Sequence, residues 1–223
     1  MQKFATTTAV SVVLDVPAGH VRLIAADRAD ATVEVRPESA GKSRDVKAAE
    51  QTDVTFADGV LRITAPEGKN QMFGPSGSIE VTVQVPAGSR VDAKGAALDL
   101  RGVGRLGDVV CEAAQGPVKL DEAASARIAL QAGDITVGRL GGDAEISTQM
   151  GALHIAEAVQ GTVSLTTSKG DITVGAARGV SASLDAGTSY GRIHNSLKNS
   201  DGSGSALTVR ATTSYGDITA RSL

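Results

Sequence analysis

The feature that most constrains this chain is a glycine that returns six times in its second half. Each of these glycines follows a run of mostly small or polar residues, and apolar residues stand two and usually four places after it. The glycines are Gly116, Gly133, Gly151, Gly170, Gly191 and Gly216. A period of this length with apolar residues two apart predicts coils of β-strand that bury their inner face only by stacking on one another. The fold class expected is therefore all-β, a single-chain β-solenoid (β-helix) of about 18–25 residues per coil.

A second strand precedes each glycine, with inward residues seven and five places before it, as in Val163 and Leu165 before Gly170. The first apolar residue after each glycine should also point inward. We expect these residues to form one buried column that follows the order of the sequence, and in the later coils they are Ile135, Leu153, Ile172, Ile193 and Ile218.

The first 90 residues are also β in pattern but lack the regular period. We expect residues 1–90 to form an irregular β cap that starts the solenoid, and residues 91–223 to form its regular part, as one continuous structural unit. Two inserts interrupt the cap. The charged stretch from Lys42 to Gln51 predicts a short surface helix, and the stretch from Pro66 to Gly77, rich in Gly, Pro and Asn, predicts a loop.

Composition excludes several classes of partner. The formal net charge of -3 gives no electrostatic case for binding nucleic acid or an anionic membrane surface. No apolar segment approaches the roughly 20 residues that span a bilayer. The start of the chain lacks a charged stretch followed by an apolar core, so a cytoplasmic location is expected, or export if the native N-terminus is longer. Cys111 stands at an apolar place and is expected to be a small buried residue.

Acidic and histidine side chains recur near the glycines but in alternate coils of the sequence. Asp134 and Asp171 would be separated by two strand spacings, roughly 9.6 Å, which is too far for one calcium ion. His154 and His194 have Thr173 between them, and the same spacing argues against a shared zinc ion. No catalytic order of Ser, His and Asp is present. We therefore expect no metal, no cofactor and no enzymatic activity.

Short motifs repeat along the coils. Gly-Asp-Ile-Thr occurs at 133–136, 170–173 and 216–219, Thr-Ser-Tyr-Gly at 188–191 and 213–216, and Val-Pro-Ala-Gly at 16–19 and 85–88. With the irregular β start, these motifs resemble a bacterial family of β-strand repeat proteins of unknown function that is labelled "putative adhesin". The resemblance covers essentially the whole chain. It implies a β-solenoid of head-domain type without known enzymatic activity.

Tyr190 and Tyr215 take the same corner position of two coils, and Lys169 takes it in the coil before them. One reading is an external stack of the two rings beside a lysine, which adds stability. The other reading is a contact anchor, because exposed tyrosines favour interfaces.

The C-terminal end predicts self-association. After the coil that holds Ile218, only Arg221, Ser222 and Leu223 remain, too few to cover an open core and its unpaired backbone. We expect a dimer or an end-to-end assembly through this last coil, and the candidate interface residues are Tyr190, Tyr215, Ile218 and Leu223.

Three functions remain open at this point. The first is a non-catalytic scaffold or interaction module that self-associates and also binds an unidentified protein. The second is an exported, adhesin-like surface-binding protein, which the Thr- and Ser-rich outer strands also suit. The third is a carbohydrate-active β-helix enzyme, placed last because aromatic platforms and clustered acids are sparse.

Overall fold

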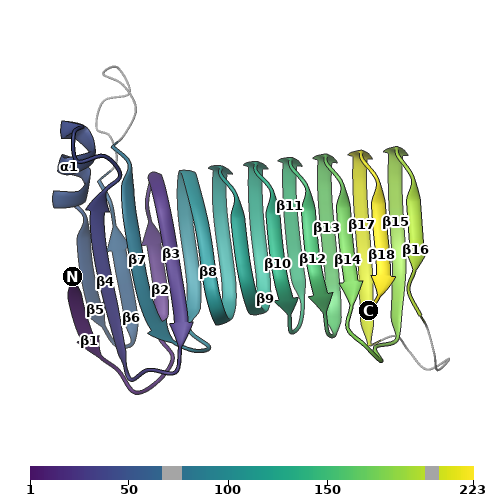
Figure 1. The fold of residues 1–223 in the computed structure, drawn as a ribbon, viewed down its shortest axis with the longest axis horizontal. Helices are drawn as coiled ribbons and strands as arrows, with labels where there is room; N and C mark the ends of the chain where they lie inside the picture. Colours follow the sequence, from purple (N-terminus) through teal and green to yellow (C-terminus); the bar gives the residue numbers. More distant parts are fainter. Residues whose placement is uncertain (67–76, 199–205) are drawn as a thin grey trace. The chain divides into compact units, whose positions relative to one another are not determined.

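The structure is a computed structural model that describes residues 1–66, 77–198 and 206–223. The chain forms two compact units, Met1–Gly116 and Pro117–Leu223 (Figure 1). Nearly all described elements are β-strands, so the all-β solenoid predicted from the glycine repeat is confirmed. The division at residue 90 stays a prediction, and most of the loop predicted between Pro66 and Gly77 lies outside the described residues.

The described residues of unit 1 form eight strands and one helix. They are β1 (Gln2–Ala5), β2 (Ser11–Asp15), β3 (Ala18–Ala26), β4 (Asp30–Pro37), α1 (Ser43–Glu50), β5 (Asp53–Ala57), β6 (Val60–Thr64), β7 (Ile79–Pro86) and β8 (Arg90–Gln115).

The strands of unit 1 lie in two rows. One row runs β5-β6-β2 and ends on the first residues of β8, and the other runs β1-β4-β7-β3 and ends on the middle of β8. The inner pairs are parallel, as in stacked coils, whereas the pairs of β1, β4 and β5 are antiparallel. Period-two alternation buries one face of β2, β3, β6 and β7, for example at Val21 and Leu23 on β3.

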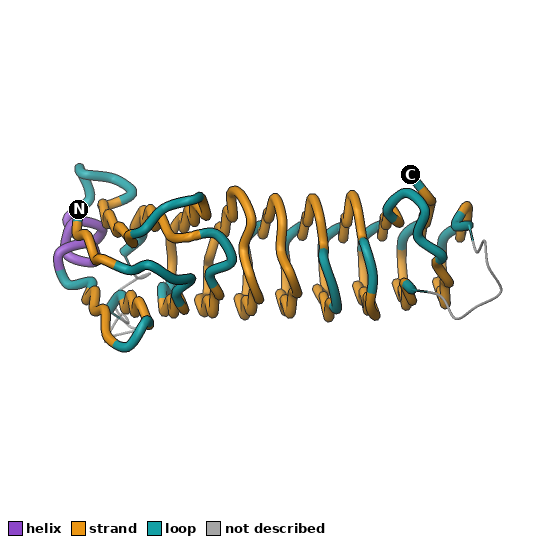
Figure 2. The backbone as a smooth tube through the Cα atoms, turned by 90° about the horizontal axis from the view of Figure 1, so that it is seen from below, coloured by secondary structure: helices purple, strands orange, loops and turns teal. Residues whose placement is uncertain are grey.

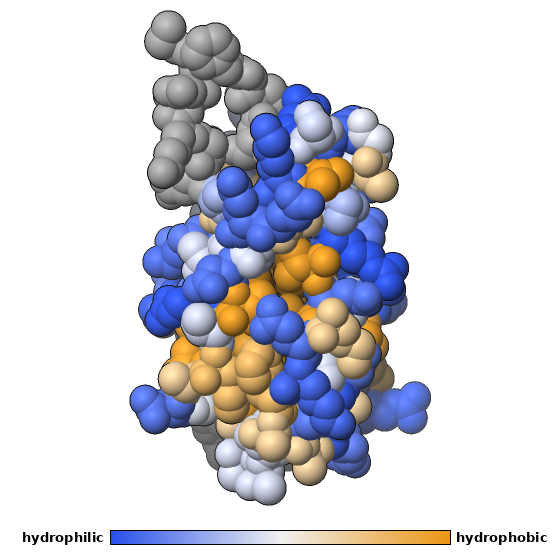
Figure 3. Space-filling view, turned by 90° about the vertical axis from the view of Figure 1, so that its left-hand side faces the viewer, coloured by the Kyte–Doolittle hydropathy of each residue, from blue (hydrophilic) through white to orange (hydrophobic). Residues whose placement is uncertain are grey.

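The outermost strands of unit 1 meet at the edge of the two rows. Phe4 on β1 and Phe56 on β5 place their ring centroids 5.2 Å apart, which joins the two rows at their edge. On this side, hydrophobic residues gather in the middle of the surface and hydrophilic residues surround them (Figure 3).

The helix predicted from the charged stretch is confirmed as α1, which lies against β4 and β7. Its Asp45 is buried, and one carboxylate oxygen accepts a hydrogen bond from the backbone N–H of Ser78 at 3.1 Å. The insert is thereby attached to the start of β7. Among the described residues, no helix is long and apolar enough to cross a membrane.

Unit 2 has ten strands in the part of the chain that the structure describes. They are β9 (Val118–Ala132), β10 (Ile135–Leu140), β11 (Ala144–Met150), β12 (Leu153–Ala158), β13 (Gly161–Lys169), β14 (Ile172–Ala176), β15 (Ala182–Tyr190), β16 (Ile193–Ser196), β17 (Leu207–Tyr215) and β18 (Ile218–Ser222). Every pair that these strands form within the unit is parallel. Each coil contributes one strand to each of two columns, and Figure 2 shows the turns between them.

The order of the coils in unit 2 differs from the order of the sequence. Strand β17 lies between β13 and β15, and β18 lies between β14 and β16. The last coil of the sequence, β17–β18, is therefore inserted before the coil β15–β16. The predicted inner column is present, but Ile218 sits between Ile172 and Ile193 in it, and Ile193 at its end is exposed rather than buried.

The repeated glycine forms the corner between the two columns. Gly170 has φ +154°, a value that residues with a side chain rarely adopt. A Cβ at Gly170 would also collide with the carbonyl oxygen of Gly151, the corner glycine of the preceding coil. At Gly170, glycine is therefore required both by the backbone angle and by the close stacking of the corners.

Candidate functional site

Threonine side chains bind the glycine corners to one another. The hydroxyl of Thr213 donates to the carbonyl oxygen of Gly170 at 3.1 Å, and that of Thr188 donates to Gly216 at 3.0 Å. Each threonine thus satisfies a carbonyl of the neighbouring coil from the inside of the corner. This is the structural role of the threonine in Thr-Ser-Tyr-Gly.

Thr213→Val is expected to lower the free energy of unfolding of unit 2 by about 1 kcal/mol. Valine keeps the shape of the buried side chain but leaves the Gly170 carbonyl without this donor. Thr173→Val is the matched control, because no hydrogen bond of its hydroxyl is found in the described chain. Chemical denaturation followed by circular dichroism measures both changes, and equal effects would remove the role assigned to Thr213.

The corner aspartates bind the next coil rather than their own turn. Asp171 Oδ1 accepts from the backbone N–H of Asp217 at 2.8 Å, and Asp217 Oδ1 accepts from that of Arg192 at 2.9 Å. The backbone hydrogen bond from Arg192, and then its guanidinium, hold the pKa of Asp217 below its ordinary value. Along the stack, Asp171, Asp217 and Arg192 therefore lie on three successive coils.

The histidines of unit 2 are further apart than their sequence order suggests. Thr173 and Thr219 both lie between His154 and His194 in the column of paired residues. In the described residues, no group of three His, Cys, Asp or Glu side chains is placed to hold a metal ion. Cys111 is buried, and burial raises the pKa of its thiol to about 12, as expected for a residue that packs rather than reacts.

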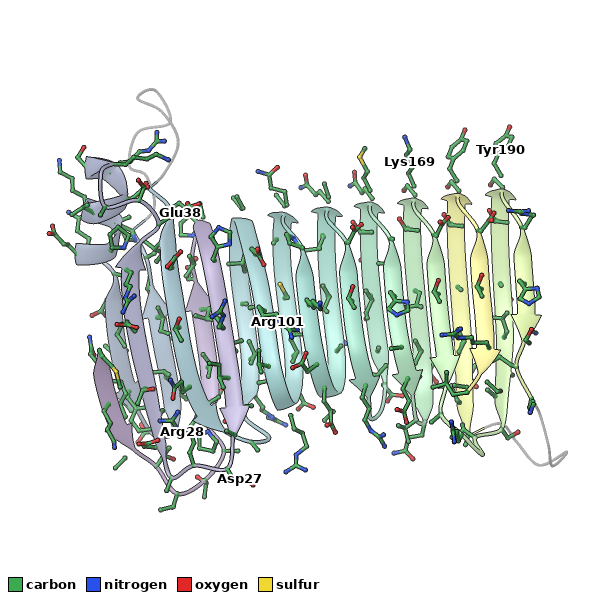
Figure 4. The ribbon with its side chains drawn as sticks, in the orientation of Figure 1. Asp27, Arg28, Glu38, Arg101, Lys169 and Tyr190 are labelled. Atoms are coloured by element: carbon green, nitrogen blue, oxygen red, sulfur yellow. The ribbon has the colours of Figure 1, made fainter. Side chains whose placement is uncertain are left out.

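Tyr190 and Tyr215 stack with ring centroids 4.9 Å apart and planes 4° from parallel. The stack of the two rings predicted from the sequence is confirmed, but Tyr215 rather than Tyr190 lies next to Lys169. The tyrosines are 68% and 56% exposed. Figure 4 labels Lys169 and Tyr190, which project from the same end of their strands. One face of the Tyr190 ring is covered by Tyr215, and no described coil lies beyond the other face.

The coil β15–β16 is the last coil of the stack. Within the described residues, β15 pairs only with β17 and β16 pairs only with β18. Ile193 on β16 is 46% exposed, whereas its neighbour Ile218 is 1% exposed. The stack therefore ends on Ile193, which was not among the interface residues predicted from the sequence.

The four predicted interface residues are not brought together as expected. Ile218 is buried between two coils and cannot form the end of the stack. Leu223 is exposed, but its backbone N–H donates to Ala176 on β14, so it lies against the inner neighbour of its coil. Tyr190 lies on the end coil, with Tyr215 directly behind it.

Asn195 was a sequence signal that β15–β16 ends the stack, because it is polar at an inner place that is apolar in the other repeats.

Comparisons with known proteins found one family model and several solved structures that resemble this chain. The family model described as Toastrack DUF4097 matches residues 9–222. A solved structure named "Putative lipid binding protein" from Parabacteroides distasonis has a TM-score of 0.50 and 13% identity, covering 98% of this chain and 95% of that chain. A "putative adhesin" from Bacteroides fragilis has a TM-score of 0.47 and 12% identity, with coverage of 98% and 95%. No curated protein matches this chain.

Proposed function

We propose that this chain, which belongs to the Toastrack DUF4097 family, is a non-catalytic β-solenoid module that self-associates through β15–β16. The match of the family model to residues 9–222 confirms the family that the repeated motifs indicated. The observation that carries the proposal is the exposure of Ile193, 46%, in a column where Ile172 and Ile218 are 0% and 1% exposed. An apolar residue left open at the end of a stack lowers the free energy when another surface covers it.

The backbone of the same coil supports this proposal. Strands β15 and β16 pair on one side only among the described residues. On the open side of β15, the N–H of Ala182 donates to the carbonyl oxygen of Lys198 at 3.2 Å. The rest of this edge of β15 and the outer edge of β16 face no described strand, and such edges are templates for a further strand. Lysine, proline and bulges usually protect open edges, but β15 and β16 contain no lysine or proline.

A second copy of this chain is the partner that fits this edge. An identical terminal coil has the same spacing between its two strands and the same half-open core. Two copies related by a twofold axis would bring β15 and Ile193 of each against the other, which is the usual symmetry of soluble dimers. The free face of Tyr190 lies at the same end, where stacking on an aromatic ring adds to area burial.

The test is the molar mass of the protein by analytical ultracentrifugation across a wide range of concentrations. We expect the mass of the native protein to rise toward that of a dimer, and Ile193→Lys to hold it at the monomer, because lysine on an edge strand opposes pairing. The matched control is Met150→Lys, since Met150 is 58% exposed but lies on β11, an inner strand of the stack.

A native protein that stays monomeric at all concentrations would refute self-association. If Ile193→Lys and Met150→Lys lower the molar mass equally, the assignment of the contact to β15–β16 is refuted and the contact lies elsewhere.

A further inference from the structure

An open hollow of about 300 Å³ lies on the outer face of unit 1. Polar side chains from three neighbouring strands line it: His20 and Arg22 from β3, Glu80 and Thr82 from β7, and Asp99 and Arg101 from β8. Residues two apart on a strand point to the same side, so each strand contributes two side chains to the hollow. The result is two rows across the sheet, one basic and one mainly acidic.

The basic row places two arginines opposite each other. Arg22 is paired in register with Arg101 on one side and with Thr82 on the other. Like charges directly opposite on neighbouring strands are destabilising. Arg101 Nη1 donates to the carbonyl oxygen of Gly102 at 3.3 Å, but Arg22 has no hydrogen bond or ion pair to the described parts of the chain. An anion between the two guanidinium groups would turn this repulsion into attraction.

The second row contains His20 between Glu80 and Asp99. His20 Nδ1 lies 3.1 Å from Asp99 Oδ2, and its Nε2 lies 3.4 Å from Glu38 Oε1. A hydrogen bond from the Ser78 side chain, and then the contact with His20, lower the pKa of Glu38. Glu38 is labelled beside the end of β4 in Figure 4, and Arg101 on β8.

Glu80 differs from Asp99 and Glu38, which both contact His20. No hydrogen bond or ion pair of Glu80 is found within residues 1–66, 77–198 and 206–223. The hollow therefore contains one cation, Arg22, and one anion, Glu80, that are each without a partner there. Since they stand on neighbouring strands two residues out of register, they are diagonal neighbours roughly 7–8 Å apart.

From these charges we propose that the hollow binds a compact zwitterion that carries a phosphate and an ammonium group. The phosphate lies between Arg22 and Arg101, and the ammonium lies against Glu80. Arginine forks recognise phosphate with paired hydrogen bonds, and the tetrahedral oxygens of a phosphate can face two forks at once. Complementary charges at both ends give selectivity over a simple anion or a simple cation.

Isothermal titration calorimetry with phosphoethanolamine tests this site. We expect phosphoethanolamine to bind roughly tenfold more tightly than inorganic phosphate or ethanolamine alone. Arg22→Gln and Glu80→Gln should each weaken its binding by roughly tenfold as well. The matched control is Arg127→Gln, which removes an arginine that is 72% exposed and pairs with Glu145 at 3.3 Å in unit 2. Circular dichroism checks that all three variants remain folded.

The proposal is overturned if phosphoethanolamine does not bind, if phosphate alone binds equally well, or if Arg22→Gln and Arg127→Gln have the same effect. Flotation with phosphatidylcholine vesicles that contain phosphatidylethanolamine then separates two sources of the ligand. Vesicle binding that is lost in Arg22→Gln and Glu80→Gln would assign a lipid headgroup. Binding of the soluble compound without vesicle binding would assign a free metabolite, and both results support the site.

Discussion

Gly170→Ala is expected to lower the free energy of unfolding of unit 2 by about 3 kcal/mol or more. The alanine must adopt φ +154°, which costs energy for any residue with a Cβ. Its methyl group would also meet the carbonyl oxygen of Gly151, which is a backbone atom of a packed coil and cannot move away alone. Chemical denaturation followed by circular dichroism gives the total loss. Hydrogen exchange shows whether the coils on both sides of the corner open.

The matched control is Gly187→Ala, which adds the same methyl group to β15. A Cβ at Gly187 meets no atom within 4 Å, and its φ is not in the positive range. We expect a change within about 0.5 kcal/mol. If the two alanines destabilise the protein equally, neither the backbone angle nor the close stacking of the corners explains why glycine recurs.

The same glycines explain why the fold could be predicted from the sequence. A corner that only glycine can occupy repeats once per coil, so its period gives the length of the coil. The apolar residues on both sides of it give the two inner columns. Pairing of Ile135 with Leu153, and of Leu153 with Ile172, follows directly from that alignment.

The order of the last two coils could not be obtained in this way. The repeats at 182–196 and 207–222 carry the same Thr-Ser-Tyr-Gly corner, and periodicity does not say which one stacks on β13–β14. Composition favours the observed order. The coil β17–β18 has the apolar Ala220 at the inner place where the coil β15–β16 has the polar Asn195. The coil β17–β18 is therefore the better suited of the two to the position that is covered on both sides. A polar residue at the open end avoids the desolvation that burial would require.

The two candidate sites differ in how far sequence reasoning reaches. The contact of Tyr190 with Tyr215 was predicted because equivalent repeat positions form one column. The hollow in unit 1 was not predicted, since residues 20, 80 and 99 lie on strands without a shared motif or period. Only the pairing of β3 with β7 and β8 brings them together.

Ile218→Ala is expected to lower the free energy of unfolding of unit 2 by about 2–5 kcal/mol, and Ile193→Ala by about 1 kcal/mol or less. Ile218 is packed between Ile172 and Ile193, so the smaller side chain leaves a cavity with neighbours on both sides. Ile193 has only Ile218 beside it in the described stack, and 46% of its surface is already exposed. Denaturation at low protein concentration keeps any dimer from contributing to either value.

This pair of variants separates the two possible orders of the coils. If the coils stacked in the order of the sequence, Ile193 would lie inside the stack and Ile218 at its end, so Ile193→Ala would be the more damaging change. The inserted order predicts the reverse. Because both variants remove the same atoms from equivalent places in two repeats, intrinsic strand propensity and loss of side-chain volume are nearly equal between them. The sign of the difference therefore reports which coil is covered on both sides.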